Sequence, residues 1–134
     1  MIELLRPFSL CRYNSVHNII EVTTYGPASF PELIEIFNCI AELCVQQKSA
    51  NILIDHSDLD VGALSMNEIN NPRRLTASAE DILKMRKCAH VAVKDLQYGL
   101  VRAWEIMVEV NGFDNLETKI FRNRNEAIEW PGTS

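Results

Sequence analysis

The feature that most constrains the fold is the alternation of short apolar runs with helical patterns along most of the chain. Asn51–Asp55 and His90–Lys94 are short runs rich in strand-forming residues. Around them lie longer segments in which apolar residues recur every three or four positions, as they do on one face of a helix. Strands that alternate with helices favour a largely parallel sheet, because parallel neighbours need a crossover connection. The pattern therefore predicts an α/β domain.

The clearest helical segment follows Gly26-Pro27, a pair that should end the preceding strand. Ser29-Phe30-Pro31-Glu32 combines an N-cap serine, an early proline and a glutamate at the third position, which is the capping-box pattern. Beyond it, apolar residues gather on one side of the helix and glutamates on the other. This predicts a surface helix with one buried face.

The other elements complete a single domain over residues 1–134. The predicted order is β-β-α-β-α-β-α-β-α, with a mixed, largely parallel sheet of about five strands and helices packed on it. Besides those above, we expect a hairpin of Glu3–Leu10 and Val16–Thr24 around a break at Arg12–Ser15, a weak helix at Gly62–Asn71, a helix over Thr76–Lys87, a helix from about Gln97 to Val110, a strand at Leu116–Phe121 and a short helix opening at Asn123.

Composition narrows the class of protein. The 134 residues carry a formal net charge of −5 and no basic stripe, which argues against a nucleic-acid partner. Apolar runs are too short for a membrane span, and the first residues lack the pattern of a signal peptide. We therefore expect a cytoplasmic protein without integral membrane association and without a cofactor. Its four cysteines have no C-x-x-C spacing, so we expect reduced, mostly buried thiols at Cys11, Cys39, Cys44 and Cys88.

A polar cluster follows the first apolar run, and one more aspartate follows the second. The carboxyl ends of parallel strands meet at one edge of an open sheet, where ligands bind if the strand order reverses. Two alternatives stay open: the aspartates could hold a hard cation such as Mg²⁺, or they cap helices and accept hydrogen bonds from loop N–H groups. Nothing fixes a coordination geometry, so no metal site is predicted. We interpret the cluster as an interaction loop made of Asp55, His56, Ser57, Asp58, Asp60, Ser65 and Asp95.

No motif predicts catalysis. Asp55, His56 and Ser57 are neighbours in sequence, whereas a catalytic triad is assembled from distant segments. A G-x-S-x-G elbow, a His/Cys group with zinc spacing and a glycine-rich phosphate loop are all missing from the sequence. We therefore predict no catalytic residue and expect that the protein is not an enzyme.

The segment 98–110 is more apolar than one sheet face requires. On a helical wheel, Arg102, Glu105 and Glu109 fall within a wedge about 60° wide, and apolar residues fill most of the remaining circumference. A surface helix needs only a stripe of roughly 100°. The surplus could face a neighbouring helix of the domain, a homodimer partner or an apolar ligand. For the last two cases we expect the contact through Tyr98, Val101, Trp104, Met107 and Val108.

The order and spacing of these elements resemble the SpoIIAA-like family, whose fold belongs with STAS and CRAL-TRIO-type domains. The likeness covers nearly all of residues 16–130. Each matching piece is unspecific by itself, and the resemblance rests on the order in which the pieces follow one another. The matching pieces are Ile20-Glu21-Val22 through Gly26, then 52-ILID-55, 91-VAVKD-95, Tyr98-Gly99 with Trp104-Glu105, and Ile120-Phe121-Arg122 leading into Glu126-Ala127-Ile128-Glu129-Trp130.

The resemblance implies a non-enzymatic domain. STAS relatives often act as regulatory protein-interaction modules, some of them switched by phosphorylation of a serine just after the strand that corresponds to Asn51–Asp55. Those members carry a short Asp-Ser-Ser-Gly-like signature, which residues 56–62 lack, so Ser57 and Ser65 are candidates by position only. CRAL-TRIO relatives hold lipids in an apolar cavity.

Three functions follow in order of preference. The first is a non-catalytic, STAS-like regulatory or protein-interaction module with a protein partner, which could also be a second copy of the chain. The second is a small carrier that binds a lipid or another apolar molecule in a cavity under the helix 98–110. The third is a metal-dependent enzyme that uses the aspartates of the polar cluster.

Overall fold

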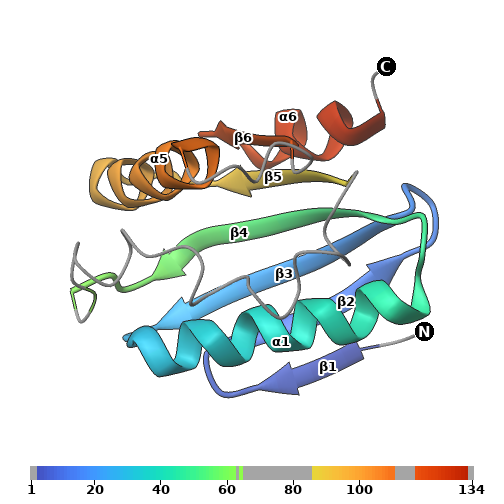
Figure 1. Cartoon of the computed structure of the whole chain (residues 1–134), viewed down its shortest axis with the longest axis horizontal. Helices are drawn as coiled ribbons and strands as arrows, with labels where there is room; N and C mark the ends of the chain where they lie inside the picture. Colours follow the sequence, from blue (N-terminus) through green and yellow to red (C-terminus); the bar gives the residue numbers. More distant parts are fainter. Residues whose placement is uncertain (1–2, 63, 65–85, 111–116, 133–134) are drawn as a thin grey trace.

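The computed structural model of the chain describes residues 3–62, 64, 86–110 and 117–132. Within these residues the strands form one six-stranded sheet in the order β1-β2-β3-β4-β5-β6 (Figure 1). The strands are β1 (Glu3–Arg6), β2 (Ser9–Asn14), β3 (Ile19–Gly26), β4 (Asn51–Leu59), β5 (Lys87–Val91) and β6 (Glu117–Phe121), and the helices are α1 (Phe30–Gln46), α5 (Asp95–Val110), α6 (Arg124–Glu129) and a 3-10 turn at Trp130–Gly132.

The mixed, largely parallel sheet is confirmed, with one strand more than expected. β3, β4, β5 and β6 pair in parallel, while β1, β2 and β3 pair antiparallel. The strand order follows the sequence from one edge to the other. The order never reverses along the sheet, so the ligand-binding crevice expected at a reversal is missing from the described part of the chain.

The predicted N-terminal hairpin is wrong, because this region forms three strands. Pro7 and Phe8 turn the chain between β1 and β2, with Phe8 at φ 70°, and the break predicted at Arg12–Ser15 lies mostly inside β2. Proline fixes its own φ and lacks an N–H donor, so a strand run that contains one ends there more readily than it continues. The second turn comes at residues 15–18.

Other boundaries shift for similar local reasons. β5 spans Lys87–Val91 instead of the predicted His90–Lys94, and Lys87 therefore does not end a helix over Thr76–Lys87. The rest of that helix, and all of the weak helix Gly62–Asn71 except Gly62 and Leu64, lie outside the described residues. The helix expected from Gln97 is confirmed and begins at Asp95. The last strand and the short C-terminal helix are confirmed as β6 and α6.

The N-termini of α1 and α6 are capped in different ways. Ser29 is the N-cap of α1, but its hydroxyl donates to the Glu32 carboxylate and it makes no side-chain bond to the backbone. Asn123 caps α6 as expected, because its side chain accepts hydrogen bonds from the N–H groups of Asn125 and Glu126.

Helices α1 and α5 cover one face of the sheet, and α6 covers part of the other. In Figure 1, α1 crosses in front of the strands. A chain that moves from strand to strand in one direction through right-handed crossovers places its crossover helices on the same face. The main core forms there between α1 and strands β2 to β5, and it includes Cys11, Ile20, Val22, Ile40, Leu43, Ile52, Ile54 and Cys88. A smaller core under α6 contains Ile19, Leu53, Ala89, Val91 and Ala127.

Further features of the fold bear on the expectations above. All four cysteines are buried and free. Within the described parts of the chain, none of the helices is long and apolar enough to cross a membrane.

Arg86, directly before β5, anchors the carboxyl end of α1. Its guanidinium donates to the carbonyl oxygens of Cys44, Gln47 and Ala50, and the residue is buried. The last carbonyls of a helix have no partner within the helix, and they favour a positive charge. Arg86 therefore joins the end of α1 to the start of β5, and it fixes α1 against the sheet.

We expect Arg86→Met to lower the free energy of unfolding by roughly 2–4 kcal/mol, because hydrogen bonds from a charged donor are lost and buried carbonyls are left without it. Urea denaturation measures this change. Arg102→Met is the matched control, since the Arg102 side chain is 55% exposed and its loss should cost less than about 1 kcal/mol. Equal losses in the two variants would contradict the anchoring role of Arg86.

Candidate functional site

The predicted interaction loop is wrong in its structure, because its first residues lie within β4. The strand continues past Asp55 to Leu59, and it pairs with β3 through Tyr25 opposite Asp58 after a bulge. Successive residues of a strand point to opposite faces of the sheet. Asp55 and Ser57 therefore lie on the face of α6, and His56 lies on the face of α1 and α5.

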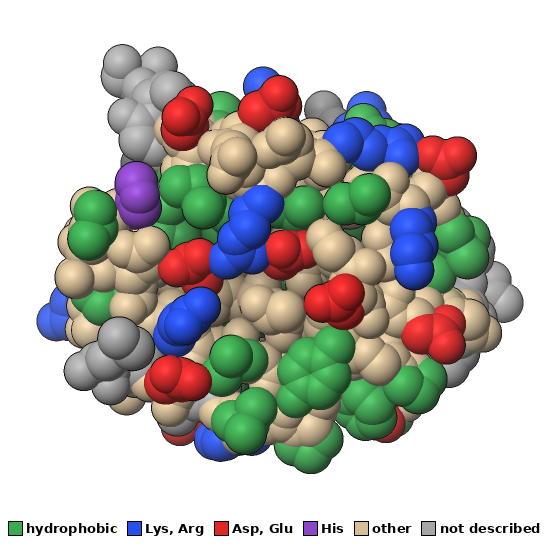
Figure 2. Space-filling model, turned by 180° about the vertical axis from the view of Figure 1, so that it is seen from behind, with side chains coloured by type: hydrophobic (Ala, Val, Ile, Leu, Met, Phe, Trp, Pro, Cys, Tyr) green, Lys and Arg blue, Asp and Glu red, His purple; other side chains and the backbone are tan. Residues whose placement is uncertain are grey.

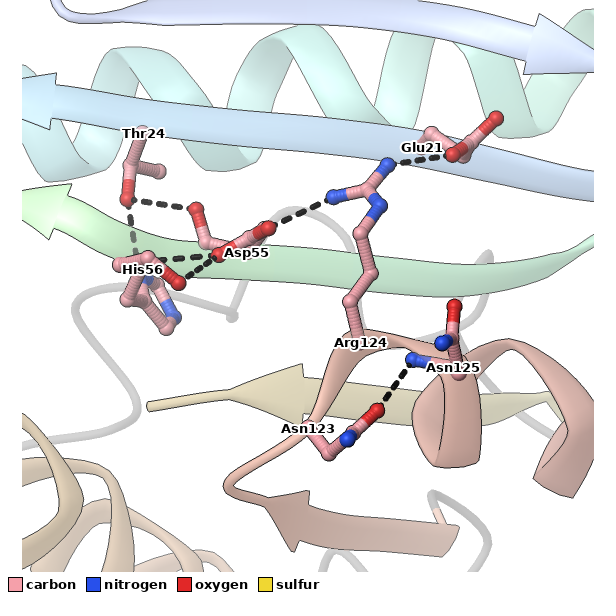
Figure 3. Close-up of polar contacts among 8 residues, drawn as sticks. Glu21, Thr24, Asp55, His56, Asn123, Arg124 and Asn125 are labelled. Atoms are coloured by element: carbon pink, nitrogen blue, oxygen red, sulfur yellow. Dashed lines mark hydrogen bonds and ion pairs between the residues drawn. The ribbon is translucent and has the colours of Figure 1, made fainter. Parts of the chain in front are cut away.

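Asp55 belongs to a charged network on the α6 face. The Arg124 guanidinium donates from Nη1 to Asp55 Oδ2 at 2.7 Å and from Nη2 to Glu21 Oε1, so it bridges β4 and β3 (Figure 3). The other Asp55 oxygen accepts hydrogen bonds from the backbone N–H and the hydroxyl of Ser57. Seen from this side, acidic and basic side chains lie next to each other across the middle of the molecule (Figure 2).

The network keeps Asp55 ionised. Burial by itself raises the pKa of the Asp55 carboxyl, but the hydrogen bonds from Ser57 and Arg124 outweigh it and lower that pKa below its usual value. Burial likewise opposes the charge on Arg124, and its two carboxylate partners nevertheless raise the guanidinium pKa. The three side chains thus form a compensated cluster that ties α6 to the sheet.

The remaining aspartates of the predicted cluster have other partners or stand exposed. Asp60 accepts a hydrogen bond from the Gly62 N–H, and Asp95 pairs with Arg122 at 2.8 Å. Asp58 is exposed, and Ser65 lies outside the described residues. Asp95 does not directly follow a strand as predicted, because β5 ends at Val91 and Asp95 is the first residue of α5. In the described ranges, no three His, Cys, Asp or Glu side chains are placed to hold a metal ion together.

On the opposite face, the half-buried His56 and the buried His90 form a pair. His56 Nε2 lies 3.3 Å from His90 Nδ1, and the two rings stack with their centroids 5.5 Å apart and an interplanar angle of 12°. His56 Nδ1 lies 2.9 Å from the hydroxyl oxygen of Thr24 on β3. His90 Nε2 lies 3.5 Å from Cys88 Sγ on β5. The contacts form a chain across three strands.

The hydrogen bonds of this series could run from donor to acceptor in either of two directions, and one direction is favoured. Thr24 has a single hydroxyl proton and also reaches the Asp55 carbonyl oxygen at 3.3 Å. If Thr24 donates to that carbonyl, His56 Nδ1–H donates to Thr24, His90 Nδ1–H donates to His56, and the Cys88 thiol donates to His90. This order makes four hydrogen bonds, whereas the reverse order makes three of them. Both imidazoles are then neutral and carry their proton on Nδ1.

Burial favours the same neutral state. It disfavours the charged imidazolium and lowers the pKa of His56 to about 4. For His90, burial and then the proximity of His56 lower the pKa to about 3. Neutral rings can serve as both donor and acceptor, which the chain of hydrogen bonds requires.

The histidine pair lies at a pocket between α1, α5 and the sheet. Leu33 and Phe37 of α1 form one wall, and Leu100 and Val101 of α5 form another. The pocket has a volume of about 60 Å³. The segment 98–110 therefore contributes two apolar side chains, Leu100 and Val101, to the pocket wall.

The end of β4 and the start of α5 complete the pocket. Leu59, Val61 and Leu64 close it beyond the strand, and Gln97 reaches it from the first turn of the helix. The Gln97 side-chain amide donates to the carbonyl oxygens of Ser57 and Leu59, while its oxygen accepts from the Lys94 N–H. Gln97 thereby caps α5 and satisfies the backbone where β4 ends.

The other residues predicted on the apolar face of α5 have varied positions. Val101 lines the pocket, whereas Tyr98 packs under Arg122, whose guanidinium carbon lies 4.4 Å from the ring centroid. Trp104, Met107 and Val108 lie within the helix, but their side chains are outside the described residues. Glu105 of the predicted polar wedge is nearly buried and accepts a hydrogen bond from Thr118 of β6.

Several residues of both clusters were not predicted from the sequence. Thr24, His90, Gln97 and Arg124 carry most of the polar contacts, yet none belongs to a recognised motif. Only the pocket histidine His56 has a usable signal, because it continues the alternation of Ile52 and Ile54 and so belongs to the inward-facing set.

Comparisons with known proteins add a likeness of fold. No protein-family model matches the chain, and no curated protein matches it either. Among solved structures, the chain is similar to an uncharacterized protein of the DUF3478 family with a SpoIIAA-like fold from Shewanella loihica PV-4. The TM-score is 0.48 at 19% identity, over 84% of this chain and 83% of that chain. This likeness concerns the fold alone and supports no activity.

We expect Arg124→Met to lower the free energy of unfolding by about 2 kcal/mol, because it leaves two partly buried carboxylates without their cation. The Arg124 side chain is 35% exposed, so solvent reduces the loss below that of a fully buried pair. The control is Arg122→Met, whose partner Asp95 is almost fully exposed. Chemical denaturation compares the two variants. If Arg122→Met destabilises as much as Arg124→Met, the network does not hold α6.

The histidine pair makes stability depend on pH in a defined window. The folded pKa values of about 4 and about 3 lie below the usual histidine pKa of 6.5, so the unfolded chain binds more protons between pH 6.5 and pH 4. Stability is therefore complete above pH 6.5 and falls as the pH is lowered to 4. From pH 7 to pH 5 each histidine should cost roughly 1–2 kcal/mol.

Denaturation at a series of pH values checks this dependence, and His90→Gln should reduce its slope by about half. Asp55 contributes a further loss only as the pH falls through the usual carboxyl pKa and below it, outside the range from pH 7 to pH 5, which separates the two effects. A wild-type stability that stays flat between pH 7 and pH 5 would show that the imidazoles are not buried in their neutral form.

Proposed function

We propose that this domain is a non-catalytic, STAS-like regulatory module whose pocket between α1 and α5 accepts an apolar group from a protein partner. The observation that carries the proposal is the pocket itself, which is walled by Leu33, Phe37, Leu100 and Val101. A concave, mostly apolar site with a few polar groups is the usual form of a binding site in proteins.

The size of the pocket favours a side chain over a whole lipid. An engineered cavity of about 150 Å³ holds a benzene molecule. The pocket here has about 60 Å³, which suits the end of one apolar side chain. Leu96 is 65% exposed and lies one helical turn before Leu100, so it extends the apolar surface outward from the pocket along α5. A partner could contact both.

The proposal is non-catalytic because the polar residues of β4 point to opposite faces of the sheet. Asp55 and Ser57 bind each other on the α6 face, and His56 binds Thr24 and His90 on the pocket face. The three neighbours therefore cannot act as a nucleophile, a base and an orienting carboxylate. Asp55 is already engaged by Arg124, which speaks against the metal-dependent reading of the aspartates.

The proposal is tested by selecting a displayed library of random peptides on the purified domain. We expect enriched peptides to share one large apolar residue, and their affinity should fall at least tenfold for Leu100→Trp, whose indole fills the pocket. The matched control is Val45→Trp, which adds the same group at an exposed position of α1 outside the pocket. Isothermal titration of the selected peptides measures the difference.

Either of two results would contradict the proposal. One is the absence of any enriched peptide, and the other is equal affinity of the enriched peptides for the wild type and for Leu100→Trp.

The second candidate function is a carrier of a free apolar molecule, and the location of the pocket under α5 favours it. A lipid could place only one end in the pocket as it stands. Native mass spectrometry of the purified protein, before and after extraction with organic solvent, tests this candidate. An added mass that the solvent removes would support the carrier, and an unmodified mass in both samples would count against it.

A further inference from the structure

The polar atoms at the wall of the pocket already have partners. His56 uses both ring nitrogens, for Thr24 and for His90. The second nitrogen of His90 faces Cys88. Gln97 uses its amide nitrogen for two backbone carbonyls and its oxygen for a backbone N–H. Apart from the second lone pair of the Gln97 oxygen, a group that enters the pocket would have to break one of these bonds before it could form its own.

Breaking such a bond is costly because the series of hydrogen bonds is continuous and its His90 end is buried. It runs from Cys88 through both histidines to Thr24, across β5, β4 and β3. A hydrogen bond taken from it leaves a buried ring nitrogen unsatisfied, which costs more than the net gain from an ordinary hydrogen bond. The three polar residues in the wall, His56, His90 and Gln97, therefore behave as an apolar surface to an incoming group.

A charged ligand would meet no compensating charge among the described residues of the pocket wall. The described residues that line it include no Lys, Arg, Asp or Glu. The two imidazoles are neutral, and burial holds the pKa of each well below neutral pH. A carboxylate or an ammonium group would therefore lose its hydration without gaining an ion pair, which is strongly unfavourable.

We infer that the pocket selects uncharged apolar groups without hydrogen-bonding atoms, and that it rejects carboxylates and ammonium groups of the same shape. The inference rests on the proposed function and names the chemistry of what that site accepts. The group it selects is a side chain of the protein partner: branched aliphatic side chains fit, and acidic or basic ones do not.

The test uses three small probes of nearly identical shape: isobutene, acetone and acetate. They carry a CH₂, a neutral carbonyl oxygen and a charged carboxylate oxygen at corresponding positions. Each is titrated into protein with ¹³C-labelled leucine and valine methyl groups, followed by NMR. We expect isobutene to shift the methyl signals of Leu100 and Val101 with an affinity at least tenfold above that of acetate, and acetone to lie between them. Xenon, an apolar atom, should shift the same signals.

Controls separate failure of the inference from failure of the proposed function. Leu100→Trp should abolish the shifts caused by isobutene and xenon, with Val101→Trp as a substitute if the first variant does not fold. Val45→Trp should leave them unchanged. If acetate shifts the pocket methyl signals as strongly as isobutene, the selectivity is wrong while the pocket remains a binding site. If neither isobutene nor xenon shifts them, the pocket accepts no apolar group, and the proposed function fails with the inference.

Discussion

The structure depends on one constraint, the sequential order of its parallel strands. Because the chain moves from β3 to β6 in a single direction, its crossover helices α1 and α5 pack on the same face of the sheet. The other face is left for α6, which follows the last strand. Each residue of the central strand β4 therefore faces one of two different environments, and its position in the alternation determines which.

The two environments give neighbouring residues opposite chemistry. Asp55 faces α6, where the Arg124 guanidinium and the Ser57 hydroxyl stabilise its charge. His56, the next residue, faces the helices α1 and α5, where burial and its contact with His90 keep it neutral. A polar segment that looks like one site in the sequence is thus divided between a structural ion-pair network and the wall of an apolar pocket. The division favours a binding role over catalysis, because it separates the groups that chemistry would have to bring together.

Much of the fold could be predicted because its signals are local. The apolar run 52–55, the amphipathic pattern of α1 and the asparagine cap of α6 each determine their element within a few residues. The sites could not be predicted in the same way, because their contacts are distant in sequence. Arg124 reaches Asp55 from 69 positions away, and His90 meets His56 from 34 positions away. The polar residues that continue β4 look like a loop in the sequence, because their hydrogen-bonding partners lie far away along the chain. Those partners are what allow the polar side chains to be buried in a strand.

The central feature is the neutral, mutually hydrogen-bonded histidine pair that β4 (His56) and β5 (His90) present to the pocket. The most direct measurement is ¹⁵N NMR of protein labelled at its histidine ring nitrogens, at pH 7, with assignment through His56→Asn and His90→Gln. The arrangement that makes all four hydrogen bonds from Cys88 to the Asp55 carbonyl requires both rings to be neutral and to carry the proton on Nδ1. Ring nitrogens typical of a charged imidazolium, or rapid exchange between tautomers as in a free histidine, would contradict the account.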